Sequence, residues 1–428
     1  MISVVEKNWH TIDKCRICKN PNLVEIIDLG MMELSGHFPR PNEIVDSAPL
    51  TLVKCFGAEA CGLVQLAHSY SLSEMYGLNY GYRSGLNQSM VRHLEQHVRN
   101  LESKLTLVEQ DVVIDIGSND CSLLKKYRSP EVRKIGIDPT IKKFSSFYPS
   151  DVVQIADFFP NPVVKEILNG RKAKIITSMA MFYDLEDPSA FVASIAENLD
   201  GEGLWLFEQS YLPIMLDKTS YDTICHEHLE YYCIKQIKWM LDRTDLKIVD
   251  IQFNDINGGS FSVVVAHEDS SHTEFSRLQE LLDAEKSCDS LETFEDFRLR
   301  VLRHGRELHD RIIELKSLGH RVLGYGASTK GNVILQHCKI GPALMPMVLE
   351  VNLDKLGCTT PGGRVPIVNE KDFVLEAMDI LLPLPWHFRN IFEEKLSGFL
   401  EKGGQILYPL PKIDLVGKKN TSEIGARV

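Results

Sequence analysis

The chain has 428 residues, which is enough for two or three domains with separate cores. Its 44% hydrophobic and 25% charged residues are typical of a globular protein, and its net charge of -12 argues against a nucleic-acid partner. No apolar run is long enough to cross a membrane and residues 1–14 lack a signal peptide's apolar segment, so we expect a cytoplasmic protein whose ten cysteines are reduced or metal-bound.

Two pairs of cysteines predict a zinc-binding module over residues 1–75. A four-thiolate zinc site brings two such pairs together, and Gly62 after the last cysteine suits a tight turn. The second pair is more widely spaced than is usual, so unligated thiols remain the alternative. A site closed by four protein ligands would be structural and not catalytic. The four expected ligands are Cys15, Cys18, Cys55 and Cys61.

A loop rich in Tyr and Gly over residues 75–85 precedes a predicted helix over residues 88–105. The loop either packs between domains or acts as a lid that offers phenolic hydroxyls to a substrate. On the helix, His93 and His97 are four residues apart, which places both on one face. The pair could bind a metal, but no third ligand is evident, so we expect these histidines to pack or to face solvent.

The stretch from Val112 to Asp120 is the most informative motif. Its apolar residues predict a central parallel strand covered on both faces, followed by a turn at Gly117. Leu123, Leu124 and Tyr127 have helical spacing, so we expect a helix directly after the turn. A strand, a Gly turn and a helix start form the ligand site of doubly wound α/β folds, although an ordinary α/β turn is the alternative.

The order Asp115-x-Gly117-x-x-x-Cys121 differs from the GxGxxG of phosphate-binding turns. An acid before the turn would repel a pyrophosphate, but it suits a ligand with a cationic amino-acid end. The pattern resembles the Asp/Glu-x-Gly-x-x-x-Gly motif of class I methyltransferases, which bind S-adenosylmethionine, except that Cys121 replaces the last Gly. Later strand ends add residues placed to bind the ribose and the adenine. The expected cofactor-binding residues are Asp115, Gly117, Ser118, Asn119, Asp138, Asp157, Phe158 and Ser178.

The segment Ser220–Tyr232 follows another buried strand, residues 204–208, that ends in an acid. Within it, His226 and His228 flank Glu227 among several tyrosines. The spacing is not that of an HExxH zinc motif. A neutral imidazole can remove a proton near pH 7 and a neighbouring carboxylate can polarise it. A structural His/Glu network is the alternative, and the position just past a strand end favours catalysis. Residues 257–260 then predict a hairpin turn.

The remaining chain predicts a charged helical connector over residues 268–319 and a second α/β domain over residues 320–428. Buried strands are expected near residues 322–326, 347–351, 379–382 and 405–408. The run from Gly324 to Asn332 offers backbone N–H groups and Lys330 to a phosphate at a helix start, and Arg364 could clamp a second phosphate. An ordinary Gly-rich turn that binds no ligand is the alternative to nucleotide-diphosphate binding.

Together these motifs resemble the three-domain S-adenosylmethionine-dependent sugar C-methyltransferases over nearly the whole chain. The resemblance rests on the cysteine module, the Asp115 motif, Cys-His-Glu-His-Leu-Glu-Tyr-Tyr, Gly-Tyr-Gly-Ala-Ser-Thr-Lys-Gly-Asn and Trp-His-Phe-Arg at residues 386–389. It implies an N-terminal zinc module, a class I methyltransferase domain over residues 76–267 and a C-terminal Rossmann-like domain that binds the nucleotide. The implied substrate is a nucleotide-linked keto-sugar held between the last two domains.

By that resemblance His228 is the general base, Glu227 lies beside it, and Tyr80 and Tyr82 belong to a substrate lid. We expect Tyr80 to join the catalytic residues. Two positions depart from the family, because Cys225 stands where a Tyr is common and the run Met181–Tyr183 lacks a His. The expected substrate-binding residues are Tyr82, His226, Lys330, Asn332 and Arg364.

The reaction implied is C-methylation next to a ketone after proton removal by His228. O-methylation of a nucleotide-sugar or phospho-sugar is the enzymatic alternative, since it could use the same base. A non-catalytic, zinc-stabilised binding protein is the alternative from another class. The sequence indicates neither a nucleic-acid nor a membrane partner, and it does not fix the sugar, its nucleotide or the oligomeric state.

Overall fold

The computed structural model describes residues 8–71, 75–76, 82–129 and 131–417. The chain forms two compact units, each assembled from segments that are distant in sequence. Unit 1 contains Met1–Ile26, Thr51–Pro213 and Glu227–Leu291, and unit 2 contains Ile27–Leu50, Ile214–His226 and Glu292–Val428. The domain boundaries expected at residues 75, 267 and 319 remain a prediction. In the part of the chain described here, no helix is both long and apolar enough to cross a bilayer.

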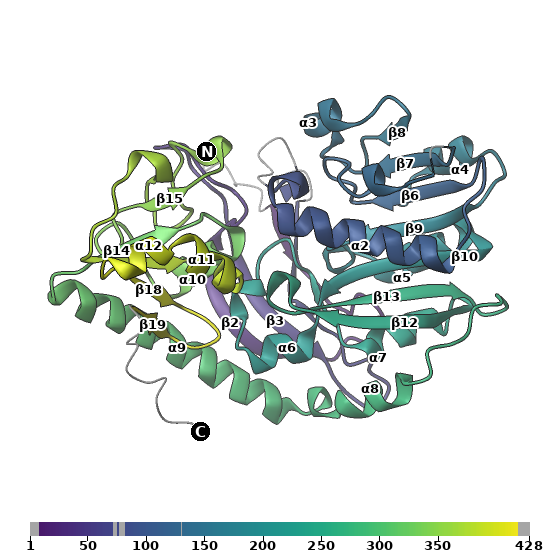
Figure 1. Ribbon diagram of the computed structural model, residues 1–428. Coiled ribbons are helices and arrows are strands. Elements are labelled where there is room, and N and C mark those ends of the chain that lie inside the picture. Colours follow the sequence, from purple (N-terminus) through teal and green to yellow (C-terminus); the bar gives the residue numbers. More distant parts are fainter. Residues whose placement is uncertain (1–7, 72–74, 77–81, 130, 418–428) are drawn as a thin grey trace, which may run out of the picture. The chain divides into compact units, whose positions relative to one another are not determined.

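A seven-stranded sheet forms the centre of unit 1, with the order β12-β13-β10-β9-β6-β7-β8 (Figure 1). Five strands run parallel, whereas β13 is antiparallel to β10 and β12 is antiparallel to β13. The sheet is built outward in both directions from β6, and such a switch point is where doubly wound folds bind ligands. The strands are β6 (Val112–Ile116), β7 (Arg133–Ile137), β8 (Val152–Ile155), β9 (Ala173–Met179), β10 (Leu199–Ser210), β12 (Leu246–Asn254) and β13 (Ser260–His267).

Both faces of this sheet are covered, as the Val- and Ile-rich strands predict. Along β10, Leu204 and Leu206 join a core cluster with the apolar side of helix α2 (Gln88–Lys104), which runs across the sheet in Figure 1. Trp205 points to the other face, where its ring centroid lies 6.2 Å from that of Phe191 on helix α5 (Pro188–Asn198). The alternation along β10 therefore builds two apolar layers.

The remaining elements before α9 (Leu291–Ser317) are smaller, and some of them continue from unit 1 into unit 2 along the chain. A two-stranded sheet pairs β1 with β5, and a four-stranded sheet has the order β11-β4-β3-β2. Its strand β3 ends at Cys55, one of the predicted zinc ligands. These elements are β1 (Trp9–Thr11), β2 (Leu23–Glu33), β3 (Ser47–Cys55), β4 (Val64–Leu66), β5 (His68–Tyr70), β11 (Glu230–Tyr231), α3 (Ile141–Phe144), α4 (Pro162–Leu168), α6 (Leu212–Asp217), α7 (Ile234–Leu241) and α8 (Leu278–Ala284).

Unit 2 is built on a six-stranded sheet with the order β16-β15-β14-β17-β18-β19. All strands are parallel except β19, which pairs antiparallel with β18. The order again reverses at the first strand, β14, so the carboxyl edge near β14 is the expected ligand position. The elements are β14 (Arg321–Tyr325), β15 (Val348–Glu350), β16 (Ile367–Asn369), β17 (Asp379–Pro383), β18 (Gln405–Tyr408), β19 (Asp414–Val416), α9 (Leu291–Ser317), α10 (Thr329–His337), α11 (Arg389–Lys395) and α12 (Ser397–Glu401).

Most of the predicted elements are confirmed, including the buried strands, the helix α2 and the hairpin between β12 and β13. The helix expected directly after the Gly117 turn is wrong, because only a single 3-10 turn, Leu124–Lys126, forms there. Two local features explain the difference. Asn119 and Cys121 both have positive φ, which is incompatible with a continuous right-handed helix. In addition, a proline at position 130 disfavours helical backbone in the residue before it.

Candidate active site

Carboxylates stand at the carboxyl ends of the adjacent strands β6 and β7. Asp115 is buried and accepts a hydrogen bond of 2.6 Å from Thr177 Oγ1, and its burial raises the pKa of Asp115 to about 7. Burial also raises the pKa of Asp138, whose oxygens accept hydrogen bonds from the backbone N–H groups of Asn119 and Thr140. A cationic ligand would favour the charged form of both acids. This edge therefore suits the ammonium and ribose of S-adenosylmethionine.

The next strand end supplies the residues expected to hold the adenine. Asp157 and Phe158 follow β8 and are both exposed. The Asp157 carboxylate accepts hydrogen bonds from the Phe158 backbone N–H and from Asn161 Nδ2, at 2.8 and 2.9 Å. The exposed Phe158 ring offers a flat apolar surface to a base. β6, β7 and β8 are neighbours in the sheet, so these groups share one edge with Asp115 and Asp138.

The turn after β6 has a backbone conformation that favours glycine at position 117. Gly117 has φ +74°, and a Cβ there would lie 3.0 Å from Met181 Cγ. The close packing of Met181 is thus a second reason for glycine at position 117, and the sequence alone did not indicate it. Ser118 is hydrogen-bonded to the Tyr148 hydroxyl at 2.7 Å, and Asn119 Oδ1 accepts from the Ser84 N–H at 3.0 Å. Both predicted cofactor residues thereby fix the turn.

His228 lies against the segment that follows β9. Its ring centroid is 4.3 Å from that of Tyr183, and the Leu229 N–H donates to the Tyr183 carbonyl at 2.8 Å. Tyr183 is two residues beyond Met181, whose side chain contacts the position above Gly117. A short chain of contacts therefore connects the predicted base to the predicted cofactor turn. His228 is half-buried, so its imidazole is not locked inside the core.

A buried acid, Asp184, completes this part of unit 1. Burial raises the pKa of Asp184 well above its usual value, the negative charge of Glu227 raises it further, and a hydrogen bond with Tyr76 opposes both effects. Tyr76 also lies edge-on to Phe158, with ring centroids 6.3 Å apart. The raised pKa favours the protonated form of Asp184, which can donate a hydrogen bond. Tyr76 therefore connects Asp184 with the residues after β8.

Two predicted ligand residues are buried against the protein itself. Ser178 is fully buried, and its hydroxyl accepts a hydrogen bond of 2.9 Å from Trp205 Nε1. His226 is 1% exposed and its Nε2 lies 3.3 Å from the Ala48 carbonyl oxygen. Burial lowers the pKa of His226 to about 4, so this imidazole is neutral at pH 7. Their roles in binding ligands remain predictions.

In unit 2, Lys330 at the start of α10 lies in a charged cluster. Burial lowers the pKa of Lys330, while the nearby Asp222 raises it. Asp222 is fully buried and accepts a hydrogen bond of 2.7 Å from Trp386 Nε1. Burial lowers the pKa of His387 to about 3, and the positive charges of Lys330 and Lys218 contribute. Two lysines and an imidazole near one helix start suit a phosphate-bearing ligand.

The other two nucleotide-binding candidates already have partners within unit 2. Asn332 is fully buried and its Nδ2 donates to the Ser35 carbonyl at 2.7 Å. Arg364 Nη2 lies 2.9 Å from Glu33 Oε1, and the Gly362 N–H donates to the other Glu33 oxygen. A phosphate would therefore compete with Glu33 for Arg364. The roles of Asn332 and Arg364 in substrate binding remain predictions.

The predicted lid falls partly outside the described residues. Tyr80 is among the positions for which no structure is described, so its catalytic role stays a prediction. Tyr82 is 47% exposed, and its carbonyl accepts a hydrogen bond of 3.3 Å from Asn119 Nδ2. The segment that contains Tyr82 thus contacts the cofactor turn through its backbone.

Three residues near these sites were missed when the sequence was considered alone. Tyr76 belongs to the predicted lid, but nothing in its spacing separates it from the other tyrosines. Asp222 precedes the His-Glu-His run, and only folding brings it to Trp386. Glu208 was noted as the acid at the end of a strand, and the structure places it 2.7 Å from His93 Nε2. No third ligand for His93 and His97 was evident from the sequence, and the structure supplies Glu208 as their partner.

The four predicted zinc ligands converge as expected. Cys15, Cys18, Cys55 and Cys61 have sulfur atoms that all lie within 4.8 Å of one another. Cys15 Sγ lies 3.5 Å from Cys61 Sγ, and Cys18 Sγ lies 3.4 Å from Cys55 Sγ. Such a donor set fits a tetrahedral zinc ion, whose Zn–S distances are about 2.3 Å. With four protein ligands the ion is structural.

Comparisons with known families cover nearly all of the chain. Residues 15–76 match a zinc binding domain, residues 62–251 match a methyltransferase domain, and residues 255–411 match a C-methyltransferase C-terminal domain. The methyltransferase match contains the seven-stranded sheet up to β12 and every cofactor-binding candidate. The zinc domain match contains the four cysteines.

Individual relatives agree with these families. C-methyltransferase NovU from Streptomyces niveus is 26% identical over 416 residues, which are 96% of this chain and 98% of NovU. An S-adenosylmethionine-dependent methyltransferase from Clostridium acetobutylicum is 13% identical, covers 41% of this chain and 92% of its own, and has a TM-score of 0.34. The plantazolicin methyltransferase BpumL in complex with SAH is 10% identical, covers 41% and 82%, and has a TM-score of 0.33. These two structural likenesses are too weak to support an argument.

The four-cysteine cluster, the acidic carboxyl edge of the unit 1 sheet and the three family matches agree with one another. They establish an α/β enzyme of class EC 2.1.1 that uses S-adenosylmethionine and contains structural zinc. In order along the chain, it carries a zinc-binding domain, a methyltransferase domain and a C-methyltransferase C-terminal domain, and over nearly its whole length it is similar to C-methyltransferase NovU.

Proposed function

We propose that this C-methyltransferase acts on a nucleotide-linked keto-deoxysugar, at the carbon next to the ketone, with His228 as the base. The supporting observation is the contact between the His228 ring and Tyr183, 4.3 Å between centroids, on the segment that leads from Met181 above Gly117. A base and a methyl donor near this segment could act on the same carbon. The full-length match to C-methyltransferase NovU supports transfer to carbon.

The protein's part in the reaction is to move one proton and to stabilise one oxyanion. His228 takes the proton from the carbon next to the ketone, and the electron pair of that C–H bond forms an enolate. Asp184, whose pKa is raised by burial and by the charge of Glu227, is the proposed donor in this region, and Tyr76 is hydrogen-bonded to it. Bound at the edge that carries Asp115 and Asp138, S-adenosylmethionine would supply an electrophilic methyl group to the enolate carbon, and its sulfur would keep the electrons of the S–CH3 bond that breaks. Alignment of the two reactants is expected to provide several kcal/mol of the rate enhancement.

For the nucleotide part of the substrate, we favour the cluster around Lys330 in unit 2. Lys218 and His387 add positive charge or hydrogen-bond donors near Lys330, and Asp222 opposes the lowering of the Lys330 pKa by burial. Tyr82, His226, Asn332 and Arg364 complete the proposed substrate-binding set. Replacement of Lys330 by Met is expected to raise KM for a nucleotide-sugar more than it lowers kcat.

Proton exchange tests the role of His228 without needing methyl transfer. In deuterium oxide with S-adenosylhomocysteine bound, the wild-type enzyme should exchange the proton next to the ketone of a nucleotide keto-sugar from a panel of such compounds. His228→Asn should lose this exchange and all methyl transfer while it still binds S-adenosylmethionine by calorimetry. His272→Asn, a surface histidine of the same unit, serves as the matched control. Near-normal exchange in His228→Asn would remove His228 from the base role.

The product decides between the proposal and its alternatives. Transfer of a carbon-13 methyl group to carbon gives an aliphatic methyl signal, whereas transfer to oxygen gives a methoxyl signal. A methoxyl product would replace the proposal by O-methylation of a nucleotide-sugar or phospho-sugar. No transfer to any keto-sugar, together with no thermal shift by S-adenosylmethionine, would favour a non-catalytic binding protein.

A further inference from the structure

Three side chains of unit 1 converge at a second site, away from the four cysteines. His93 and His97 lie one turn apart on α2, and Glu208 lies near the end of β10. The two Nε2 atoms are 3.0 Å apart, and Glu208 Oε2 lies 2.9 Å from His93 Nε2 and 3.0 Å from His97 Nε2. The three atoms therefore form a nearly equilateral triangle. Their side chains are 17%, 8% and 5% exposed.

Hydrogen bonds satisfy this triangle only if both nitrogens donate, to the two Glu208 oxygens at 2.7 and 3.0 Å. Each Nε2 bears either one hydrogen or one lone pair. If both nitrogens donate to Glu208, two N–H groups oppose each other at 3.0 Å. If one nitrogen instead accepts from the other, its lone pair faces the carboxylate. A cation at the centre satisfies all three atoms at once, because each then directs a lone pair at a positive charge.

The dimensions match those of a tetrahedral metal site. Zinc binds nitrogen and carboxylate oxygen at about 2.0–2.1 Å, which separates neighbouring ligand atoms by about 3.3 Å. Zinc thiolate bonds of about 2.3 Å separate sulfur atoms by about 3.8 Å. The separations of 2.9 and 3.0 Å in the triangle, and those of 3.4 and 3.5 Å in the cysteine cluster, are each within about an eighth of the respective value. The distances between donor atoms in the two clusters are therefore similarly close to those of a tetrahedral zinc site.

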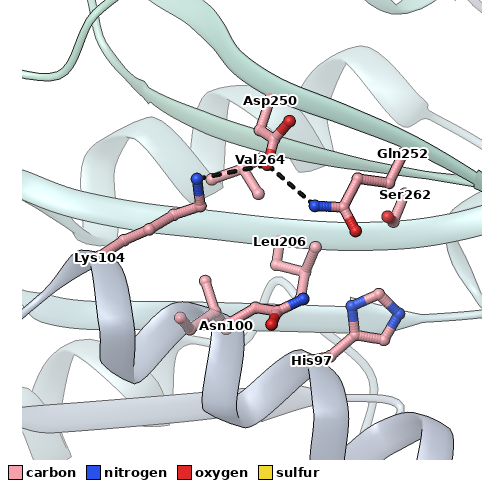
Figure 2. Close-up of a pocket in the computed structure, with 9 residues that line it drawn as sticks. His97, Asn100, Lys104, Leu206, Asp250, Gln252, Ser262 and Val264 are labelled. Atoms are coloured by element: carbon pink, nitrogen blue, oxygen red, sulfur yellow. Dashed lines mark hydrogen bonds and ion pairs between the residues drawn. The ribbon is translucent and has the colours of Figure 1, made fainter.

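The surroundings also resemble those of a metal site. Asn254 Nδ2 donates to Glu208 Oε2 at 2.7 Å, an outer contact of the kind that orients a ligating carboxylate. Beside His97 lies a small hollow bounded by Asn100 and Lys104 of α2 and by Gln252 and Ser262 of the sheet (Figure 2). Three protein ligands leave the fourth tetrahedral position to water or another ligand, and the hollow beside His97 has a mixed polar and apolar lining.

We propose that His93, His97 and Glu208 bind a divalent transition-metal ion, zinc by the chemistry of the donors, with one coordination position open. Two imidazoles and one carboxylate are a ligand set of catalytic zinc sites. The ion would join α2 to the end of β10, whose Glu208 carbonyl accepts a hydrogen bond of 2.8 Å from the Ala180 N–H. Ala180 directly precedes Met181, so the ion would also fix the start of the segment that contacts Gly117.

Metal content of the full-length protein tests the proposal. After dialysis against a weak chelator, elemental analysis should give about two zinc ions per chain for the wild type, one in each cluster. His93→Gln and, independently, Glu208→Gln should each give about one. The matched control is Gln96→Ala, an exposed change on the same helix, which should keep both ions. Circular dichroism and the thermal shift with S-adenosylmethionine confirm that each variant is folded.

Cobalt titration of the metal-free protein identifies which site is lost. Cobalt in the cysteine cluster produces a sulfur-to-cobalt charge-transfer band, which should persist in His93→Gln and Glu208→Gln. The second equivalent should produce only ligand-field bands, and these should disappear in both variants. A wild type that saturates at one equivalent, or a second equivalent that survives in both variants, would overturn the proposal and leave a hydrogen-bonded His/Glu cluster.

Discussion

Cys121 occupies the position where the methyltransferase motif has its last glycine, and the backbone explains that preference. Its φ of +66° lies in the left-handed region, which glycine enters without steric cost. Any other residue is less stable there by about 1–2 kcal/mol. The Cys121 side chain is fully buried in the core cluster of unit 1, and this burial offsets part of that cost. The departure from the motif is therefore a substitution that the fold tolerates.

The free energy of unfolding of variants at position 121 should depend more on backbone strain than on the hydrophobicity of the new side chain. Cys121→Gly removes the strain but loses apolar burial, so the free energy of unfolding should stay within about 1 kcal/mol of the wild type. Cys121→Val places a β-branched residue at positive φ and should lower the free energy of unfolding by at least about 2 kcal/mol. Urea unfolding measures both changes. Equal stability of the two variants would contradict the left-handed backbone.

His226 should make the stability of unit 2 depend on pH. Burial lowers the pKa of His226 from 6.5 to about 4, so between these values the unfolded chain binds a proton that the folded chain does not. Stability should therefore fall as the pH decreases from 6.5 towards 4, by roughly 2–3 kcal/mol from this group. His226→Gln should reduce the slope of unfolding free energy against pH in this window. His10→Gln, which changes an exposed imidazole, should not.

At the scale of elements, two glycines lie where helices pack closely against neighbouring side chains. Gly331 lies in α10 directly after Lys330, and a Cβ there would collide with Leu384. Gly305 lies in α9, and a Cβ there would be 2.7 Å from His337 Nε2. The His337 ring is held by Tyr221, with centroids 4.9 Å apart. The helices α9 and α10 therefore require glycine at these positions, because a side chain there would disturb their close packing.

Two Gly→Ala substitutions in helices should change stability in opposite directions. Gly398 in α12 is exposed, and no atom lies within 4 Å of the place that a Cβ would take, so Gly398→Ala should raise the free energy of unfolding by about 0.5–1 kcal/mol through helix propensity. Gly305→Ala gains the same propensity but must displace His337, and it should lower stability by about 1–2 kcal/mol. Denaturant unfolding compares them. A stabilising Gly305→Ala would contradict the close contact with His337.

At the scale of the molecule, the zinc cluster is connected to the rest of unit 1. Lys54, next to Cys55, donates to the carbonyls of Gly62 and Cys288 at 2.9 and 2.8 Å. Gln236 Nε2 donates to the Cys61 carbonyl at 2.9 Å. The bonds to Cys288 and from Gln236 fix the zinc-binding loops to segments that are distant in sequence, 234 and 175 residues away. Zinc should therefore stabilise the methyltransferase part of unit 1 and not only the cysteine module.

Removal of zinc should lower the same thermal transition that S-adenosylmethionine raises. Cys55→Ser is expected to destabilise unit 1 by several kcal/mol, because metal-binding free energy contributes directly to folding. Cys358→Ser, at a buried cysteine of unit 2 outside the cluster, should keep its zinc. Scanning calorimetry with and without S-adenosylmethionine measures both variants. An unchanged ligand-stabilised transition in Cys55→Ser that has lost the zinc of the cysteine cluster would contradict the coupling.

The sequence by itself determined the features that depend on local pattern. Runs of Val and Ile predicted the central strands of the two large sheets, and the paired cysteines predicted the zinc ligands. Asp115 and Gly117 identified the carboxyl edge of β6 before any contact was known. Such features follow from side-chain alternation and backbone preference within about ten residues, so neighbouring residues suffice to predict them.

Only the tertiary structure decided which distant side chains meet. The contacts of Met181 with Gly117, Tyr183 with His228, and Glu208 with His93 join residues 45 to 115 positions apart. These contacts depend on sheet order and strand register, which the burial of the whole core selects and which no single segment encodes. For the same reason, the sequence indicated a phosphate clamp at Arg364 but not its partner Glu33, 331 residues away.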